Sequence, residues 1–210
     1  GKSKDAAKKI LRAIKQDEKK MTHFRNDDDG NLCIQVPNVS KFYDKYGQLL
    51  NSSLSAVGYL LHLYTDKMFF DDLATKTFDT LDGDLKSTIY IKEVKMMLVN
   101  KNNRLCTIEE FWDKKSNTSM YNDYTIMNKI LLDYYGCSFD MDRLLASAKS
   151  FVNPGINEVD FAEAVSVIKD TAMFISQSYK TADSTLNIFD EEEVKKFIDD
   201  VVIQFICEYS

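Results

Sequence analysis

A repeated pattern of apolar residues constrains the fold of this chain more than any other feature of its sequence. Single apolar residues at Ile89, Ile126, Val159 and Phe189 recur at intervals of roughly 30–37 positions. Each is followed by apolar residues three and four positions apart, the spacing of one face of an α-helix. Internal repetition at such a period indicates supersecondary units of similar size. The sequence therefore predicts a series of short loops, each leading into an amphipathic helix.

Composition agrees with a helical protein. The 210 residues include 7 Gly and 2 Pro, which suits helices with few tight hairpins. Hydrophobic residues at 44% and charged residues at 29% predict a soluble globular chain, with no apolar run near the ~20 residues that span a bilayer. Four widely spaced cysteines without a CxxC pair indicate reduced thiols in an intracellular protein, and no disulfide framework or zinc site.

Charge divides the chain into a basic arm and an acidic body. Residues 1–20 carry eight Lys/Arg and three Asp/Glu, whereas the remainder carries nineteen and thirty, within a total of −6. An acidic body argues against nucleic-acid binding by the body. Residues 1–26 are predicted to form a basic amphipathic helix that docks on the body. An acidic protein surface, a membrane or nucleic acid are the alternative contacts for its lysine face.

Residues 82–93 carry the most specific motif. Asp82 and Asp84 place two carboxylates two positions apart, Thr88 follows with a backbone carbonyl, and Glu93 ends the stretch. Calcium takes oxygen ligands at these positions of a twelve-residue loop. The stretch resembles the loop of an EF-hand, and the chain is similar to calmodulin-superfamily proteins with degenerate loops, loosely to sarcoplasmic calcium-binding proteins.

This resemblance implies an all-α fold of EF-hand-like helix–loop–helix pairs in two lobes, with short two-stranded β-bridges between paired loops. Helices are then expected at 78–81 and 94–98, on either side of the motif. A partner loop is expected at 119–130, with Ile89 and Ile126 meeting across a bridge. The lobes would comprise residues 27–136 and 137–210, the second ending in a long apolar helix.

A second loop at 27–38 resembles the first. Asp27, Asp29 and Asn31 stand at its first, third and fifth positions, but Asn38 stands where a glutamate should supply two oxygens. An Asx-rich turn without metal is the rival interpretation.

Departures from the EF-hand pattern predict that calcium binding is largely lost. Lys86 occupies an oxygen-ligand position of the loop at 82–93, and Ser87 stands where the turn normally uses glycine. The loops expected near 126, 159 and 189 lack ligand side chains. Helix pairs without calcium cannot open on its arrival, so their grooves would serve as constant docking surfaces.

The remaining segments predict further helices and no catalytic centre. Amphipathic helices are expected at 39–50 and 53–65, a strand at 68–70, and a capping sequence at 107–110. His23 and His62 fall on separate predicted helices and are interpreted as packed or solvated. The chain has no glycine-rich phosphate loop, nucleophile elbow or HExxH sequence.

The sequence thus predicts a cytoplasmic, non-enzymatic protein that binds a helical peptide or forms a structural part of a cytoskeletal or ciliary assembly. The alternative is a calcium sensor or buffer that uses the loop at 82–93, together with the loop at 27–38. Isothermal titration with calcium separates the two. Heat that vanishes in Glu93→Gln supports the sensor, and no heat at millimolar calcium supports the docking protein.

Overall fold

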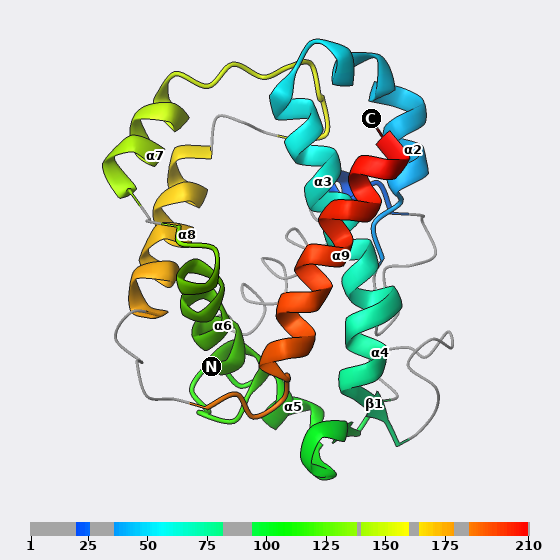
Figure 1. The fold of residues 1–210 in the computed structure, drawn as a ribbon, viewed down its shortest axis with the longest axis vertical. Helices are drawn as coiled ribbons and strands as arrows, with labels where there is room; N and C mark the ends of the chain where they lie inside the picture. The colour runs from blue at the N-terminus through cyan, green and yellow to red at the C-terminus, as the bar shows by residue number, and fades with distance from the viewer. Residues whose placement is uncertain are drawn as a thin grey trace, which may run out of the picture.

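The computed structural model describes residues 20–25, 36–81, 94–137, 140–159, 164–178 and 185–209. Most of these residues are helical, and a small antiparallel sheet lies at one end of the molecule (Figure 1). Among them, no helix has both the length and the apolar character that crossing a bilayer requires. The prediction of a mostly helical chain is confirmed, and the sheet is an addition to it.

The first pair of helices forms where the apolar periodicity predicted it. Helix α2 (Val39–Tyr46) begins at Asn38, whose side chain accepts the Lys41 N–H, and continues into the 3₁₀ helix η2 (Gly47–Asn51). Helix α3 (Leu54–Met68) begins at Ser53, whose hydroxyl accepts the Ala56 N–H. Both side chains satisfy a backbone donor that the first helical turn leaves unpaired. The predicted helices at 39–50 and 53–65 are confirmed.

Helix α3 does not end in a strand at 68–70, as predicted, but continues through a π-helical turn, η3 (Phe69–Leu73), into α4 (Ala74–Thr77). The Phe69 ring lies 6.1 Å from Phe189 and 6.4 Å from Phe197, centroid to centroid. An aromatic side chain buries a large apolar area, so these contacts favour the helical continuation over the strand.

The expected helices at 78–81 and 94–98 are wrong, because these segments form strands. Strands β1 (Phe78–Thr80), β2 (Met96–Val99) and β3 (Arg104–Thr107) make a three-stranded antiparallel sheet in that order. In β2 two half-buried residues alternate with the buried Met97 and Val99, the two-residue period of a strand with one face on the core. The 3₁₀ turn η4 (Asn100–Asn102) and the left-handed Asn103 (φ 51°) join β2 to β3.

Helix formation at 119–130 overturns the prediction of a partner loop there. Helix α6 (Met120–Tyr134) begins at Ser119, whose hydroxyl accepts the Asn122 N–H. Ile126 is buried in the middle of this helix and therefore cannot form a β-bridge, while Ile89 lies outside the described residues. The short helix α5 (Ile108–Phe111) carries the predicted capping box between Thr107 and Glu110.

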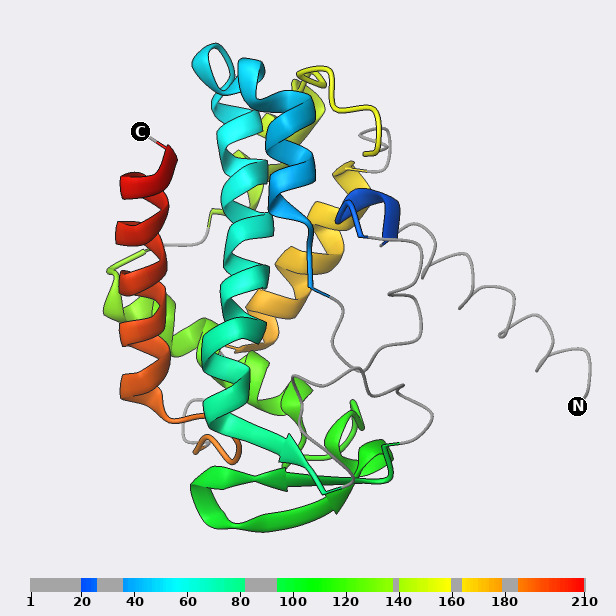
Figure 2. The same cartoon turned by 90° about the vertical axis from the view of Figure 1, so that its right-hand side faces the viewer.

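The last three helices are α7 (Met141–Lys149), α8 (Ala164–Ser178) and α9 (Glu191–Tyr209). Helix α9 has 19 residues, of which Val194, Phe197, Val201 and Phe205 are buried. Figure 2 shows α9 lying beside α3 above the sheet. Helix α8 contacts both α6 and α7 on the other side of the molecule in Figure 1.

The segment between α7 and α8 is attached to α2. Ile156 is fully buried, and the Glu158 carboxylate accepts the Tyr46 hydroxyl at 2.6 Å and pairs with Lys45. Burial of Glu158 by itself would raise its pKa, but hydrogen bonds from Lys45 and Tyr46 outweigh that effect and lower the pKa. Contacts between α2 and this segment therefore link the two sides of the molecule.

Candidate functional site

The residues predicted to bind calcium all lie outside the described part of the chain. They are Asp82, Asp84, Thr88, Glu93, Asp27, Asp29 and Asn31. The surroundings of the loop at 82–93 are nevertheless described, and they are strands β1 and β2 on its two sides. A pair of strands does not present the helix ends that flank an EF-hand loop.

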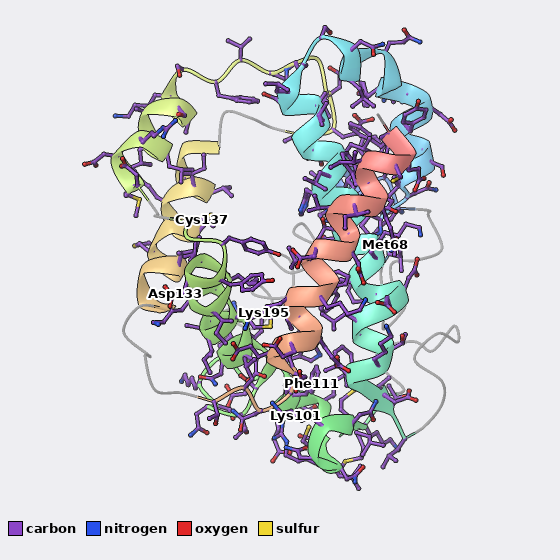
Figure 3. The ribbon with its side chains drawn as sticks, in the orientation of Figure 1. Met68, Lys101, Phe111, Asp133, Cys137 and Lys195 are labelled. Carbon is purple, nitrogen blue, oxygen red and sulfur yellow. The ribbon has the colours of Figure 1, made fainter. Side chains whose placement is uncertain are left out.

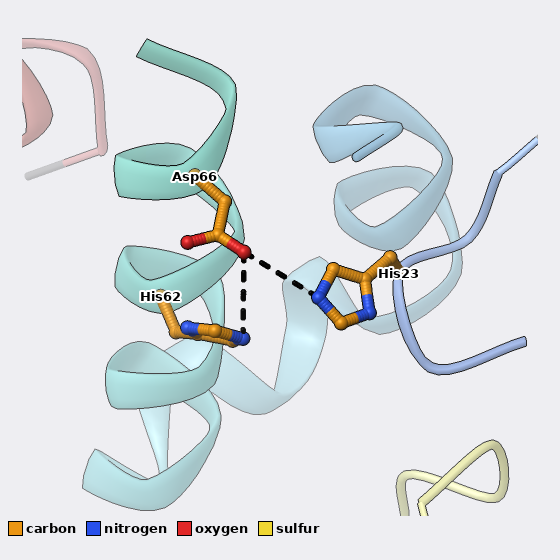
Figure 4. A group of neighbouring side chains, drawn as sticks. All are labelled: His23, His62 and Asp66. Atoms are coloured by element: carbon orange, nitrogen blue, oxygen red, sulfur yellow. Dashed lines mark ion pairs between the residues drawn. The ribbon is translucent and has the colours of Figure 1, made fainter. Parts of the chain in front are cut away.

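The structure instead brings together Asp66 and the two histidines, which were predicted to lie on separate helices. The Nε2 atoms of His23 and His62 lie 3.4 and 4.0 Å from the same oxygen, Oδ2 of Asp66 (Figure 4). One nitrogen or oxygen from each of the three side chains lies within 4.8 Å of the others. The side chain of His23 is 14% exposed, that of Asp66 39% and that of His62 52%. The cluster is therefore accessible from solvent on the His62 side.

The turn that carries His23 is held at several points. The backbone carbonyl of His23 accepts the Asn38 N–H at 3.0 Å, and the Tyr59 hydroxyl donates to the carbonyl of Thr22. The neighbouring Phe24 is buried in the left-handed backbone region (φ 55°), where a bulky side chain is rarely found. Such strain persists only when surrounding contacts maintain it.

Aromatic packing supplies those contacts for the His23 turn. The Phe24 ring lies edge-on to Phe42 at 5.3 Å and to Tyr46 at 6.0 Å, both on α2. Because Phe24 is fixed in this way, the preceding His23 is directed at α3. The His23 Nδ1 atom also lies 3.0 Å from the Thr22 hydroxyl, which orients the ring so that Nε2 faces Asp66.

Part of this cluster has a local sequence signal. His62 and Asp66 are four residues apart on one predicted helix, and such residues share a helix face. His23 has no such signal, because its position depends on how residues 20–25 fold back onto α3. The pattern HxxxD alone is too common on helix surfaces to identify a site.

A second surface feature is an apolar stripe on the side of α9 that faces away from α3. We call Val202, Ile203 and Ile206 the outer α9 face; they are 42%, 61% and 54% exposed. A helix in a globular protein normally buries one apolar face and presents polar residues on the other. Around residues 202–206, α9 carries apolar residues on both, and contiguous exposed apolar residues often mark an interaction surface.

A groove of about 380 Å³ lies between α3, η3, α6 and α9. Its lining is mainly apolar, with Asp66 and Thr65 contributing polar groups. The residues from η3, α6 and α9 that line it are Phe69, Phe70, Leu73, Tyr124, Met127, Leu131, Val194, Phe197 and Ile198. Burial of the Tyr124 phenol raises its pKa, and the Asp66 charge adds to the effect, so the hydroxyl stays neutral at physiological pH.

A buried carboxylate fixes the segment that leads into α9. Asp123 on α6 is fully buried, and its oxygens accept the backbone N–H groups of Asn187, Ile188 and Phe189 at 2.7–3.1 Å. Lys101, labelled in Figure 3, lies in the turn η4. Its ammonium group donates to the carbonyls of Leu186 and Phe189 at 3.1 and 2.8 Å. Asp123 therefore has a structural role, since all of these contacts are internal.

Comparisons of the chain with models of protein families, with curated proteins and with solved structures find no significant match.

Proposed function

We propose that this chain is a non-enzymatic protein that binds a helix of a protein partner on the outer α9 face. The observation that carries the proposal is the exposure of Val202, Ile203 and Ile206 on a helix whose opposite side is already buried. Leaving large aliphatic side chains in water costs the free energy that burial would return, about 1.5–3 kcal/mol for each. A partner that covers them recovers it.

The spacing of the outer α9 face favours a helical partner. Its three residues occupy positions i, i+1 and i+4 of a 19-residue helix and form a short strip about one helical turn long. A helix with a matching apolar stripe can lie along such a strip, which is one of the recurring ways in which proteins recognise a helical peptide.

A constant docking surface agrees with the loss of calcium ligands expected from the sequence. The calcium ligands expected from the sequence belong to the loops at 27–38 and 82–93 and not to α9, so we expect the partner to bind equally with calcium and with a chelator. The cytoskeletal or ciliary setting and the contact of the basic arm with an acidic surface are part of this proposal and rest on sequence alone.

Introducing charged residues on the outer α9 face tests this proposal. Replacing Ile203 and Ile206 together with glutamate should weaken partner binding about 100-fold, because two apolar contacts are lost and two charges must be desolvated. The matched control is Gln204→Glu, which adds a charge at an exposed polar position of the same helix. The unmodified chain and both variants are immobilised, and the partners that they retain are purified. The affinity of each partner for the three proteins is then measured.

Partner binding by the three proteins distinguishes the proposal from its alternatives. A partner bound by the unmodified chain and by Gln204→Glu, but lost from the double variant, supports the proposal. Partners retained equally by all three proteins contradict it. Binding that requires calcium would favour the sensor alternative. Self-association that light scattering detects and the double variant abolishes would show a second copy as the occupant.

A further inference from the structure

We infer that His23, His62 and Asp66 form a binding site for Zn²⁺ or for a divalent metal ion with similar ligand preferences. The three donors come from two segments that are remote in the sequence, the turn at 20–25 and helix α3. Zinc is bound in proteins by imidazole nitrogens and carboxylate oxygens, often with three protein ligands and a water in the fourth position. This proposal is independent of partner binding on the outer α9 face.

The distances fit a tetrahedral ion after a small movement. Zinc–ligand distances of about 2.0–2.1 Å place the ligand atoms of a tetrahedron about 3.4 Å apart. The His23–Asp66 distance is already 3.4 Å, whereas His62 lies 4.0 Å from the same oxygen. His62 is half exposed, so its ring has room to turn by the remaining distance.

An ion pair between Asp66 and one histidine does not account for the position of the second histidine. One protonated histidine is enough to neutralise the Asp66 carboxylate, yet two imidazoles approach the same oxygen with their ring centroids 5.5 Å apart. Two positive rings at that distance repel each other. Two neutral rings and a carboxylate offer nitrogen and oxygen lone pairs, and a divalent cation satisfies all three together.

Contacts around His23 are those that a metal ligand requires. In the tautomer in which Nδ1–H donates to the Thr22 hydroxyl, Nε2 directs its lone pair at the cluster. Ligand histidines commonly make such a hydrogen bond through the other ring nitrogen, which fixes the orientation of the ring. The buried, left-handed Phe24 and the Asn38-to-His23 backbone hydrogen bond hold the turn in advance of binding.

The donor set also selects the kind of ion. Two imidazoles and a carboxylate suit Zn²⁺, and Co²⁺ as its spectroscopic substitute, whereas calcium needs six to eight oxygen ligands. The ion would connect residues 20–25 to α3 and leave one coordination position open toward solvent. The site is chemically distinct from the calcium loops expected from the sequence.

Titration of the full chain with Zn²⁺ tests this inference. Cys33, Cys137 and Cys207 are first replaced with serine, because thiolates are alternative zinc ligands and the described Cys137 and Cys207 are exposed. We expect one Zn²⁺ per chain, unaffected by millimolar Ca²⁺. His62→Ala and Asp66→Asn should each weaken binding about 100-fold, since even the residues that support metal ligands contribute 10–100-fold. Asp71→Asn, which removes an exposed acid paired with Lys67 on the same helical surface, should bind as the parent does.

Nuclear magnetic resonance gives a second readout that does not depend on affinity. The chain has two histidines, so its imidazole spectrum contains two sets of ring signals. Both sets should shift together and reach their end point at one equivalent of Zn²⁺. Zinc that shifts neither ring, a His62→Ala variant that binds as tightly as the parent, or the absence of binding to the chain with the three serine replacements would overturn the inference.

Discussion

Replacing Asp123 with asparagine is expected to lower the free energy of unfolding by about 1–3 kcal/mol. The carboxylate is fully buried and accepts the N–H groups of Asn187, Ile188 and Phe189. Oδ2 accepts all three N–H groups, whereas Oδ1 accepts only that of Asn187. An amide can therefore keep its oxygen at the Oδ2 position, but its NH₂ group then faces the Asn187 N–H and the charge that strengthens these bonds is lost. Each buried donor left without a partner costs about 1–3 kcal/mol. Urea denaturation followed by circular dichroism measures the loss.

Asp133→Asn is the matched control for Asp123. Asp133 lies on the same helix, is 59% exposed and pairs with Lys129 at 2.8 Å. An exposed ion pair contributes about 0–1 kcal/mol, so this variant should remain close to the parent protein. Faster hydrogen exchange at the amides of Ile188 and Phe189 should accompany the loss in Asp123→Asn. Equal stability of the two variants would show that the carboxylate does not hold this segment.

Phe42→Ala should lower the free energy of unfolding by about 3–5 kcal/mol, the usual cost of removing a buried phenylalanine ring. Phe42 is fully buried, and its ring lies 5.3–5.5 Å from the rings of Phe24, Tyr46 and Tyr59. The cavity would lie where α2, α3 and the turn at 20–25 meet. The denaturation midpoint should fall while the dependence on denaturant concentration stays constant.

The neighbouring Tyr43 provides the comparison for Phe42. It is 45% exposed and contacts Tyr209 from α9 at 5.4 Å, so Tyr43→Ala should cost about 1 kcal/mol. Because Phe24 packs on Phe42, the larger cavity should also loosen the His23 turn and weaken zinc binding. Phe42→Ala as stable as Tyr43→Ala would contradict the packing described for this part of the core.

Three helices could be predicted from an apolar period of 3.6. They are the helices at 39–46, 54–68 and 191–209, and Thr107 with Glu110 marked a helix start through side-chain chemistry alone. The sheet was missed at β2, because a short apolar run fits a strand and a helix equally well. The EF-hand resemblance then favoured the helix.

Because of the same resemblance, the local sequence features that mark the start of α6 were not used. Ser119 begins that helix as an N-cap, and the buried Met120, Asp123 and Ile126 have helical spacing. Placing a loop at 119–130 depended on counting from Asp82, and the counted interval holds only if both flanks of the first loop are helices. Strands β1 and β2 remove that condition.

The sequence by itself determined the amphipathic helices, their caps and the long apolar α9, since these depend on residues within a few turns of one another. Tertiary structure alone decided that His23 meets His62 and Asp66, and that Asp123 holds the backbone at 187–189. Such contacts join residues remote in the chain, and their energy comes from ring packing and backbone hydrogen bonds that leave no periodic pattern in the sequence. The two candidate surfaces differ accordingly, because an apolar outer α9 face can be read from helical spacing, whereas a three-residue metal site requires the folded chain.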